Sequence, residues 1–316
     1  MLMPVLGVLA GLALLTFAAD QFVAGAARIA TAMRLSAIVV GAVVIGFGTS
    51  APEMVVSGLA AGQGSLDIGV GNIVGSNVAN LTLVLGVAAM ITPIAVGSSV
   101  LRREAPLSLA LTVVFAVLVQ GGLSRWNAAL LGLLLLVALT LILRSSRGGT
   151  GNESLAGGVD EYVGAQRPSL PREWTRTVLG LVGTLIAAQI LVTSASTIAA
   201  ELGLAEGFVG LTVVAIGTSL PELATAVQAA RKGQTDLIVG NLLGSNLFNS
   251  GAVAAVAGLA GPGPLSDPTI VGFATILMVG VSVLATAFMV TGKRVVRWEG
   301  AALLLGYLVC LPLLAG

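Results

Sequence analysis

Two glutamates stand inside long apolar stretches of this sequence, each at the end of nearly the same six residues. The stretch GTSAPE ends at Glu53, and GTSLPE ends at Glu222. A charged side chain at the centre of a bilayer costs about 2.5–3.5 kcal/mol on insertion scales, so a carboxylate at such a position usually has a function. Two carboxylates in matched surroundings therefore predict a site that handles cations or protons.

A second polar cluster follows each glutamate at the same distance. The pattern G-N-x-x-G-S-N-x-x-N runs from Gly71 to Asn80 and again from Gly240 to Asn249. The two copies are offset by 169 residues without a gap, and 18 of the 40 positions in 41–80 are identical to those in 210–249. This agreement indicates an internal duplication, because shared apolar composition does not reproduce the order of polar residues.

A proline in each copy frees backbone carbonyl groups near the glutamate. Pro52 has no N–H, so the carbonyl of Gly48 loses its helical partner, and Pro221 does the same to Gly217. Broken backbone at membrane depth is tolerated only where it lines a cavity or is covered by protein. The sequence therefore predicts two broken helices that present carbonyl oxygens beside the carboxylates.

The side chains of the second cluster share one helix face, since residues four apart return to the same side. Two glutamates sum to −2, which one Ca²⁺ balances, and calcium takes 6–8 oxygen ligands. Asn72 and Asn241 could instead cap helices or hold them together. The side chains with this spacing are Asn72, Ser76 and Asn80 in the first copy and Asn241, Ser245 and Asn249 in the second.

Composition places the chain in a membrane. Of 316 residues, 56% are hydrophobic and only 9% are charged, with a mean hydropathy of +1.04, whereas a soluble domain has about 25% charged residues. There is no histidine and one cysteine, Cys310, which leaves oxygen ligands and the hard cations they suit. We expect no enzyme activity, no cofactor and no nucleic acid partner; the expected partners are transported ions and lipid.

Ten apolar runs are long enough to span a bilayer, at roughly 20 residues each, and a polar linker over 145–174 separates them into two sets of five. An odd number makes the second half enter from the opposite side, as in inverted-repeat transporters. The expected fold is an all-α membrane protein with repeats over 1–144 and 175–316, and duplicated segments over about 36–92 and 205–260. The runs are 3–25, 36–61, 67–92, 105–123, 127–144, 175–199, 205–230, 236–260, 268–291 and 298–315.

Charge sets the expected orientation. With alternate loops on opposite sides, fourteen of the fifteen Lys and Arg residues fall on one side and only Arg125 on the other. The positive-inside rule then places the linker in the cytoplasm and both termini outside. A third acid within the apolar runs, Asp20, has Gln189 at its repeat position, and we expect it to have a structural role.

The doubled motif resembles the α-repeats of the cation/calcium antiporter superfamily, and the closest resemblance is to prokaryotic sodium/calcium exchangers. The resemblance implies that Glu53 and Glu222 are shared ligands for Ca²⁺ and Na⁺. It also implies that the first helix of each half slides across a fixed core. The remaining implied ligands are carbonyls of Thr49, Thr218, Gly46 and Ala215, flanking Na⁺ sites at Ser50 with Ser76 and Ser219 with Ser245, and the central Asn80 and Asn249.

The expected function is a secondary antiporter of a prokaryotic inner membrane that exports Ca²⁺ in exchange for Na⁺ by alternating access. A proton/calcium antiporter on the same fold is the first alternative, and a passive cation channel is a weaker one. Some relatives, including potassium-dependent exchangers, carry aspartate at a position matched by Asn80 or Asn249. Asparagine at both positions argues against a potassium requirement.

Overall fold

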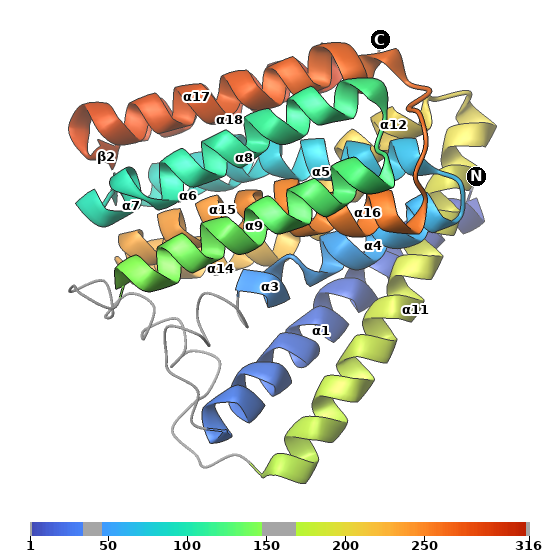
Figure 1. Cartoon of the computed structure of the whole chain (residues 1–316), viewed down its shortest axis with the longest axis horizontal. Coiled ribbons are helices and arrows are strands. Elements are labelled where there is room, and N and C mark those ends of the chain that lie inside the picture. Colours follow the sequence, from blue (N-terminus) through green and yellow to red (C-terminus); the bar gives the residue numbers. More distant parts are fainter. Residues whose placement is uncertain (1, 34–45, 147–168, 314–316) are drawn as a thin grey trace.

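The computed structural model describes residues 2–33, 46–146 and 169–313, which are largely helical (Figure 1). Seven helical stretches in this part of the chain are long and apolar enough to cross a bilayer, and an eighth qualifies if two helices bent by 43° form one span. The chain is thus a multi-pass helical membrane protein. The seven stretches are Leu2–Ala30, Leu66–Ile91, Val100–Gly121, Arg125–Arg144, Leu170–Leu202, Leu237–Ala260 and Ile270–Gly292, and the bent pair is Glu206–Thr218 with Leu220–Arg231.

These spans leave the arrangement of ten helices in two repeats as a prediction. The start of the expected helix over 36–61 and most of the linker over 145–174 lie outside the described residues. The final expected span corresponds to α18 (Arg297–Leu313), which has 17 residues and is shorter than the seven stretches above.

The first helices of the two halves, α1 (Leu2–Ala32) and α11 (Leu170–Leu202), run side by side and lean away from the other helices (Figure 1). They are antiparallel, because a Cβ at Gly7 would meet Ser194 while one at Gly25 would meet Thr177. Glycine is required along this seam, since the two backbones approach too closely for larger side chains.

The central helices are distinguished by burial. In Leu66–Ile91 and Leu237–Ala260, 83% and 78% of the most apolar part is buried, against 28% in Arg125–Arg144. These helices carry the polar clusters, so the clusters lie inside the protein. The first-copy elements are α3 (Gly46–Thr49), α4 (Ala51–Gly62), α5 (Leu66–Ala79) and α6 (Leu85–Ile91). The second-copy elements are α12 (Glu206–Val209), α13 (Ala215–Thr218), α14 (Leu220–Arg231), α15 (Thr235–Phe248) and α16 (Ala254–Ala260).

π-Helical turns interrupt these helices at matched positions. One covers Asn80–Val84 between α5 and α6, and another covers Asn249–Val253 between α15 and α16. Two further π turns cover Gly210–Val214 and Ile270–Ala274. Such bulges occur frequently at functional sites, because they redirect side chains and loosen the helical hydrogen bonds. The last asparagine of each sequence cluster therefore begins a local distortion.

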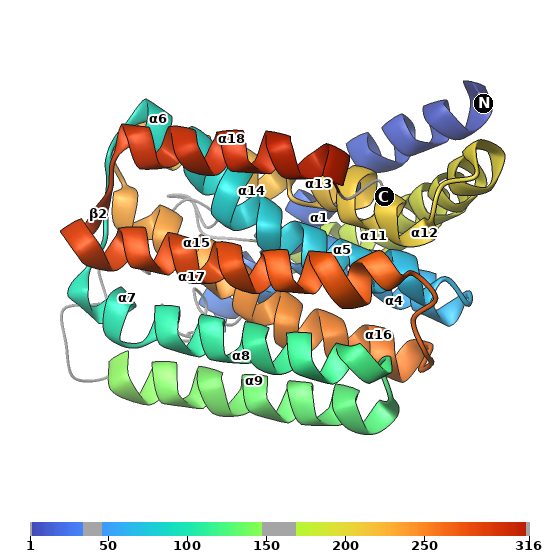
Figure 2. The same ribbon diagram turned by 90° about the horizontal axis from the view of Figure 1, so that it is seen from above.

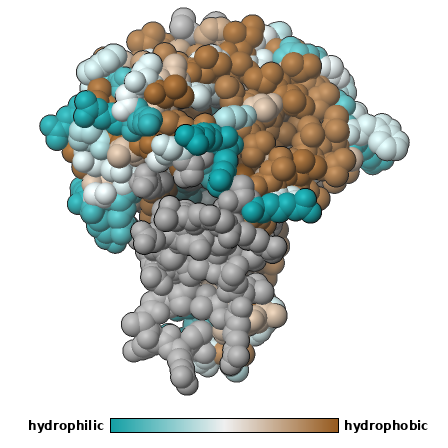
Figure 3. Space-filling model, turned by 60° about the vertical axis from the view of Figure 1, so that its left-hand side comes forward, coloured by the Kyte–Doolittle hydropathy of each residue, from teal (hydrophilic) through white to brown (hydrophobic). Residues whose placement is uncertain are grey.

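The outer helices complete the membrane domain. Figure 2 shows α8 (Glu104–Leu118) beside α9 (Arg125–Ser146), with α17 (Thr275–Gly292) packed next to α8. Figure 3 shows a broad apolar area on one side of the visible face, with hydrophilic side chains towards its borders, as lipid contact requires. The remaining short elements are α7 (Ser98–Arg102), a 3₁₀ turn over Val119–Gly121, and the antiparallel pair β1 (Ile94–Ala95) and β2 (Arg294–Val295).

Candidate ion-binding site

The two motif helices break at the serine that precedes each proline. Ser50 (φ −90°, ψ 5°) separates α3 from α4, and Ser219 (φ −86°, ψ 3°) separates α13 from α14. Pro52 and Pro221 lie in the first turn of the new helix, where a missing N–H costs no hydrogen bond. The breaks predicted from the prolines are thus present, and each one falls two residues before its proline.

The glutamates lie in the first turn after each break and are removed from solvent. Glu53 is 0% exposed and Glu222 is 1% exposed, and none of their four carboxylate oxygens has a hydrogen-bond partner among the described residues. The two carboxyl groups are near enough for their charges to interact. A buried pair of unpaired carboxylates is unfavourable by several kcal/mol, so the site requires cations or protons.

A neutral hydroxyl residue lies beside each carboxylate. Thr218 lies beside Glu53, and Ser245 lies beside Glu222. Neither hydroxyl makes a hydrogen bond to its neighbouring carboxylate. Calcium takes 6–8 oxygens, and nine buried oxygens of the predicted site residues have no partner in the described part of the chain. These oxygens are Ser50 Oγ, Glu53 Oε1 and Oε2, Asn80 Oδ1, Ser219 Oγ, Glu222 Oε1 and Oε2, Ser245 Oγ and Asn249 Oδ1.

This donor set suits a hard, weakly held cation better than a structural metal. No group of three or more Asp, Glu, His or Cys residues able to hold a metal occurs among the described residues. Two carboxylates with hydroxyl and amide oxygens fit Ca²⁺ or Na⁺ as cargo, since both prefer oxygen ligands and must also be released.

A buried hydrogen-bonded frame holds the first copy. The Asn72 amide donates to Ser57 Oγ at 3.0 Å, and its carbonyl accepts from Thr218 Oγ1 at 3.0 Å. Thr218 belongs to the other copy, so this bond joins the two halves next to Glu53. Ser76 lies 3.4 Å from the same threonine hydroxyl. Asn72 thus links α4, α5 and α13 through its side-chain amide.

Asn77 and Asn246 belong to the repeated motif but are not among the predicted site residues. The Asn80 amide donates to Asn246 Oδ1 at 2.9 Å, and the Asn246 amide donates to the Asn77 carbonyl at 3.1 Å. Asn77 in turn donates to Ser250 Oγ at 3.0 Å. The repetition of both asparagines in the two copies is the signal that marks this link between α5 and α15.

The remaining predicted ligands have less direct support. Ala215 begins α13, and its carbonyl already accepts from Ser219 N at 3.1 Å and Thr218 Oγ1 at 3.3 Å. Gly46 begins α3. Asn241 is half-buried, whereas its counterpart Asn72 is fully buried.

Helix α1 crosses both breaks, because a Cβ on Gly48 would meet the Val23 side chain and one on Gly217 would meet Leu12. A cavity of about 400 Å³ lies along this crossing. It is lined by residues of α1, both motif prolines and Thr49. The cavity therefore adjoins both helix breaks, while the two glutamates remain buried outside its lining.

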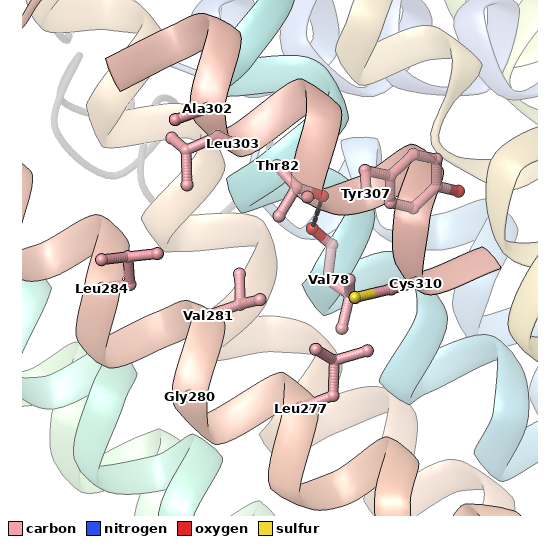
Figure 4. Close-up of a pocket in the computed structure, with 11 residues that line it drawn as sticks. Val78, Thr82, Leu277, Gly280, Val281, Leu284, Ala302, Leu303, Tyr307 and Cys310 are labelled. Carbon is pink, nitrogen blue, oxygen red and sulfur yellow. Dashed lines mark hydrogen bonds between the residues drawn. The ribbon is translucent and has the colours of Figure 1, made fainter. Parts of the chain in front are cut away.

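A second cavity, of about 270 Å³, lies between α17 and α18 (Figure 4). Its lining is almost entirely apolar, and the Thr82 hydroxyl in it already donates to the Val78 carbonyl at 2.6 Å. No carboxylate is among the described residues that line it. This cavity therefore lacks the ligands that a cation requires.

The profile of the family described as sodium/calcium exchanger protein matches residues 3–144 and 173–315. The chain belongs to this family. Its membership in the cation/calcium antiporter superfamily was predicted from the doubled motif and is confirmed. CaxA of Alkalimonas amylolytica is 38% identical over 98% of this chain and 97% of its own length.

Two further relatives match over nearly the whole chain. The sodium/calcium exchanger MaX1 of Methanosarcina acetivorans is 30% identical, with 97% of both chains aligned. A solved structure of the sodium-calcium exchanger NCX_Mj, soaked with Na⁺ and Sr²⁺, matches with a TM-score of 0.67 and 30% identity and covers 98% of both chains. The relatives support a prokaryotic exchanger, and the family's cargo is Na⁺ and Ca²⁺.

Proposed function

We propose that this chain is a Na⁺/Ca²⁺ antiporter that exports Ca²⁺ by alternating access. The observation that carries the proposal is the pair of buried, unpartnered glutamates, one from each motif copy. With both ionised, one Ca²⁺ neutralises the pair, and the same oxygens can instead hold Na⁺. The names of MaX1 and NCX_Mj as sodium/calcium exchangers support the same coupling.

The serines favour Na⁺ over protons as the coupling ion. Ser50, Ser219 and Ser245 have buried hydroxyls without a partner in the described part of the chain. Their oxygens extend the site beyond the two carboxylates, and a proton on a glutamate needs no such additional ligands. We assign Ser50 with Ser76 and Ser219 with Ser245 to two flanking Na⁺ positions, with carbonyls of Thr49, Thr218, Gly46 and Ala215 completing the ligands.

Flux measurements in proteoliposomes test the coupling. Purified protein is reconstituted, and ⁴⁵Ca²⁺ uptake is measured under imposed Na⁺, K⁺ or H⁺ gradients. We expect an outward Na⁺ gradient alone to drive uptake. We also expect external Na⁺ to raise the apparent KM for Ca²⁺, because both ions use the same glutamates and binding linkage is reciprocal. Uptake that follows only the pH gradient would establish the proton-coupled alternative, and flux without any gradient dependence would indicate a channel.

The proposed topology has ten helices in two inverted five-helix repeats, over 1–144 and 175–316, in a prokaryotic inner membrane. The antiparallel pairing of α1 with α11 supports inversion, because equivalent helices then run in opposite directions. Charge places the 145–174 linker in the cytoplasm and both termini outside. Single cysteines at Gly157 and Gly316, in a variant with Cys310 replaced, test this orientation. Labelling of the linker by an impermeant reagent from outside would reverse it.

A further inference from the structure

The cavity beside the helix breaks contains one charged side chain. Among its described lining residues, Asp20 on α1 is the only acid or base, and the polar side chains near it are Thr16, Thr49, Thr225 and Gln228. Asp20 is exposed. An exposed carboxylate inside a largely apolar membrane domain concentrates cations in the cavity that it faces.

No cation of the protein neutralises Asp20 in the described part of the chain. Its Oδ2 accepts a hydrogen bond from Gln21 Nε2 at 3.0 Å. Arg176 Nε donates to the Oε1 of the same Gln21 at 2.8 Å. The charged partner of Arg28 and Arg176 is Glu173, at N–O distances of 3.4 and 3.8 Å. Arg176 thus reaches Asp20 only through the neutral Gln21, and Asp20 makes no ion pair in the described part of the chain.

The position of Asp20 connects it to the glutamate site. Val23, three residues further along α1, packs against Gly48 at the first helix break. Three residues correspond to about 4.5 Å along a helix. The same cavity reaches Thr49 and Pro52, so it joins Asp20 to the first helix break.

The equivalent position in the second half differs in charge and in contacts. Gln189, 169 residues after Asp20, is neutral, and its Oε1 accepts from Gln63 Nε2 at 2.6 Å while its Nε2 donates to Thr193 Oγ1 at 3.0 Å. Both ends of this amide are thus hydrogen-bonded, one to the C-terminal end of α4 and the other within α11. The two halves therefore present a free carboxylate at only one of the two positions.

We propose that Asp20 is a peripheral binding position for a hydrated Ca²⁺ or Na⁺ ion that enters through this cavity. This inference rests on the proposed function and adds a second position to the glutamate site. The hydroxyl and amide oxygens of Thr16, Thr225 and Gln228 replace part of the ion's water shell. In the proposed orientation, the cavity lies towards the cytoplasmic half, where Ca²⁺ destined for export arrives.

Flux measured separately from the two sides tests the position. Asp20→Asn should raise the apparent KM for Ca²⁺ by about threefold to tenfold on the side that the cavity faces, and leave it unchanged on the other. The effect should shrink when choline chloride raises ionic strength, because screening acts over about 10 Å at 0.1 M. Asp20→Glu should restore the KM, whereas a packing role would make the larger side chain more harmful.

Two controls separate this inference from the proposed function. Gln189→Glu in the Asp20→Asn protein moves the carboxylate to the other half and should not restore the KM on the cavity side. In the Glu53→Gln, Glu222→Gln double variant, ⁴⁵Ca²⁺ equilibrium binding at low salt should retain a weak component that Asp20→Asn removes. This equilibrium measurement does not require transport, so it tests Asp20 even if no ion gradient drives flux. Identical KM values for Asp20→Asn and the parent, or weak binding that persists in the triple variant, would overturn the proposal.

Discussion

Asn72 and Asn241 occupy the same place in the two motif copies but have different surroundings. Asn72 is fully buried and hydrogen-bonded to Ser57 and Thr218, whereas Asn241 is half-buried. The residue that matches Ser57 in the second copy is Ala226, which has no hydroxyl. The first copy is thus held by a polar frame that the second copy cannot form in the same way. Duplicated residues can therefore have different neighbours.

The largest expected effect falls equally on both copies. Glu53→Gln and Glu222→Gln should each abolish Ca²⁺ transport, because either change removes half of the −2 charge that balances one Ca²⁺. Flux of ⁴⁵Ca²⁺ in proteoliposomes measures this, with thermal unfolding in detergent as the control for folding. Transport near the parent level by either folded variant would show that the two copies do not share one site.

Substitutions of the two motif glycines should differ in their effect on stability, because each glycine packs against a different side chain of α1. A Cβ at Gly48 would lie 2.6 Å from Val23 Cγ2, and a Cβ at Gly217 would collide with the end of the Leu12 side chain. Overpacking costs about 1–3 kcal/mol. We expect Gly48→Ala to destabilise more, because β-branched Val23 has fewer rotamers than Leu12. Thermal melting measures both variants, and Val23→Ala should rescue only Gly48→Ala. Equal losses without rescue would contradict the crossing of α1 over the breaks.

Removing Asn72 or Asn241 should give a smaller difference in stability between the two copies. Asn72→Ala leaves the buried Ser57 hydroxyl and its neighbours without their amide, which costs about 1–3 kcal/mol. Asn241→Ala should cost less, because the residue is half-buried. Unfolding temperatures in the same detergent compare the pair, and Ser57→Ala provides the matched control by removing the other partner. A larger loss at Asn241 would reverse the comparison.

The smallest expected change is a shift in ion dependence. Asn249→Asp adds a third negative charge where the amide has no partner in the described residues, so Ca²⁺ transport should become sensitive to mild acid or stimulated by K⁺. Asn80→Asp should in addition lower the rate of transport, because the Asn80 amide donates a hydrogen bond to Asn246 at 2.9 Å and a carboxylate cannot donate it. Flux against pH and K⁺ for both variants and the parent tests this. Profiles that superimpose would remove both asparagines from the site.

Several features of the site could be predicted from sequence because they depend on local chemistry. Pro52 and Pro221 lack an N–H wherever they stand, so a break near each of them follows from the covalent structure. Glu53 and Glu222 lie in apolar runs, so their burial follows from the composition around them. The pairing of Asn80 with Asn246 could not be predicted, because it joins two helices across the duplication, and no rule of spacing along one chain specifies that register.

The sequence by itself determined the membrane class, the duplication, the family and the two glutamates. These follow from hydropathy, from the order of polar residues and from the cost of charge in lipid. Only the tertiary structure decided that α1 crosses both Gly48 and Gly217, that Asn80 and Asn249 begin π turns, and that Asp20 faces a cavity which reaches Thr49. These features depend on how helices distant in the chain pack together, because close packing, not local propensity, selects which side chains meet.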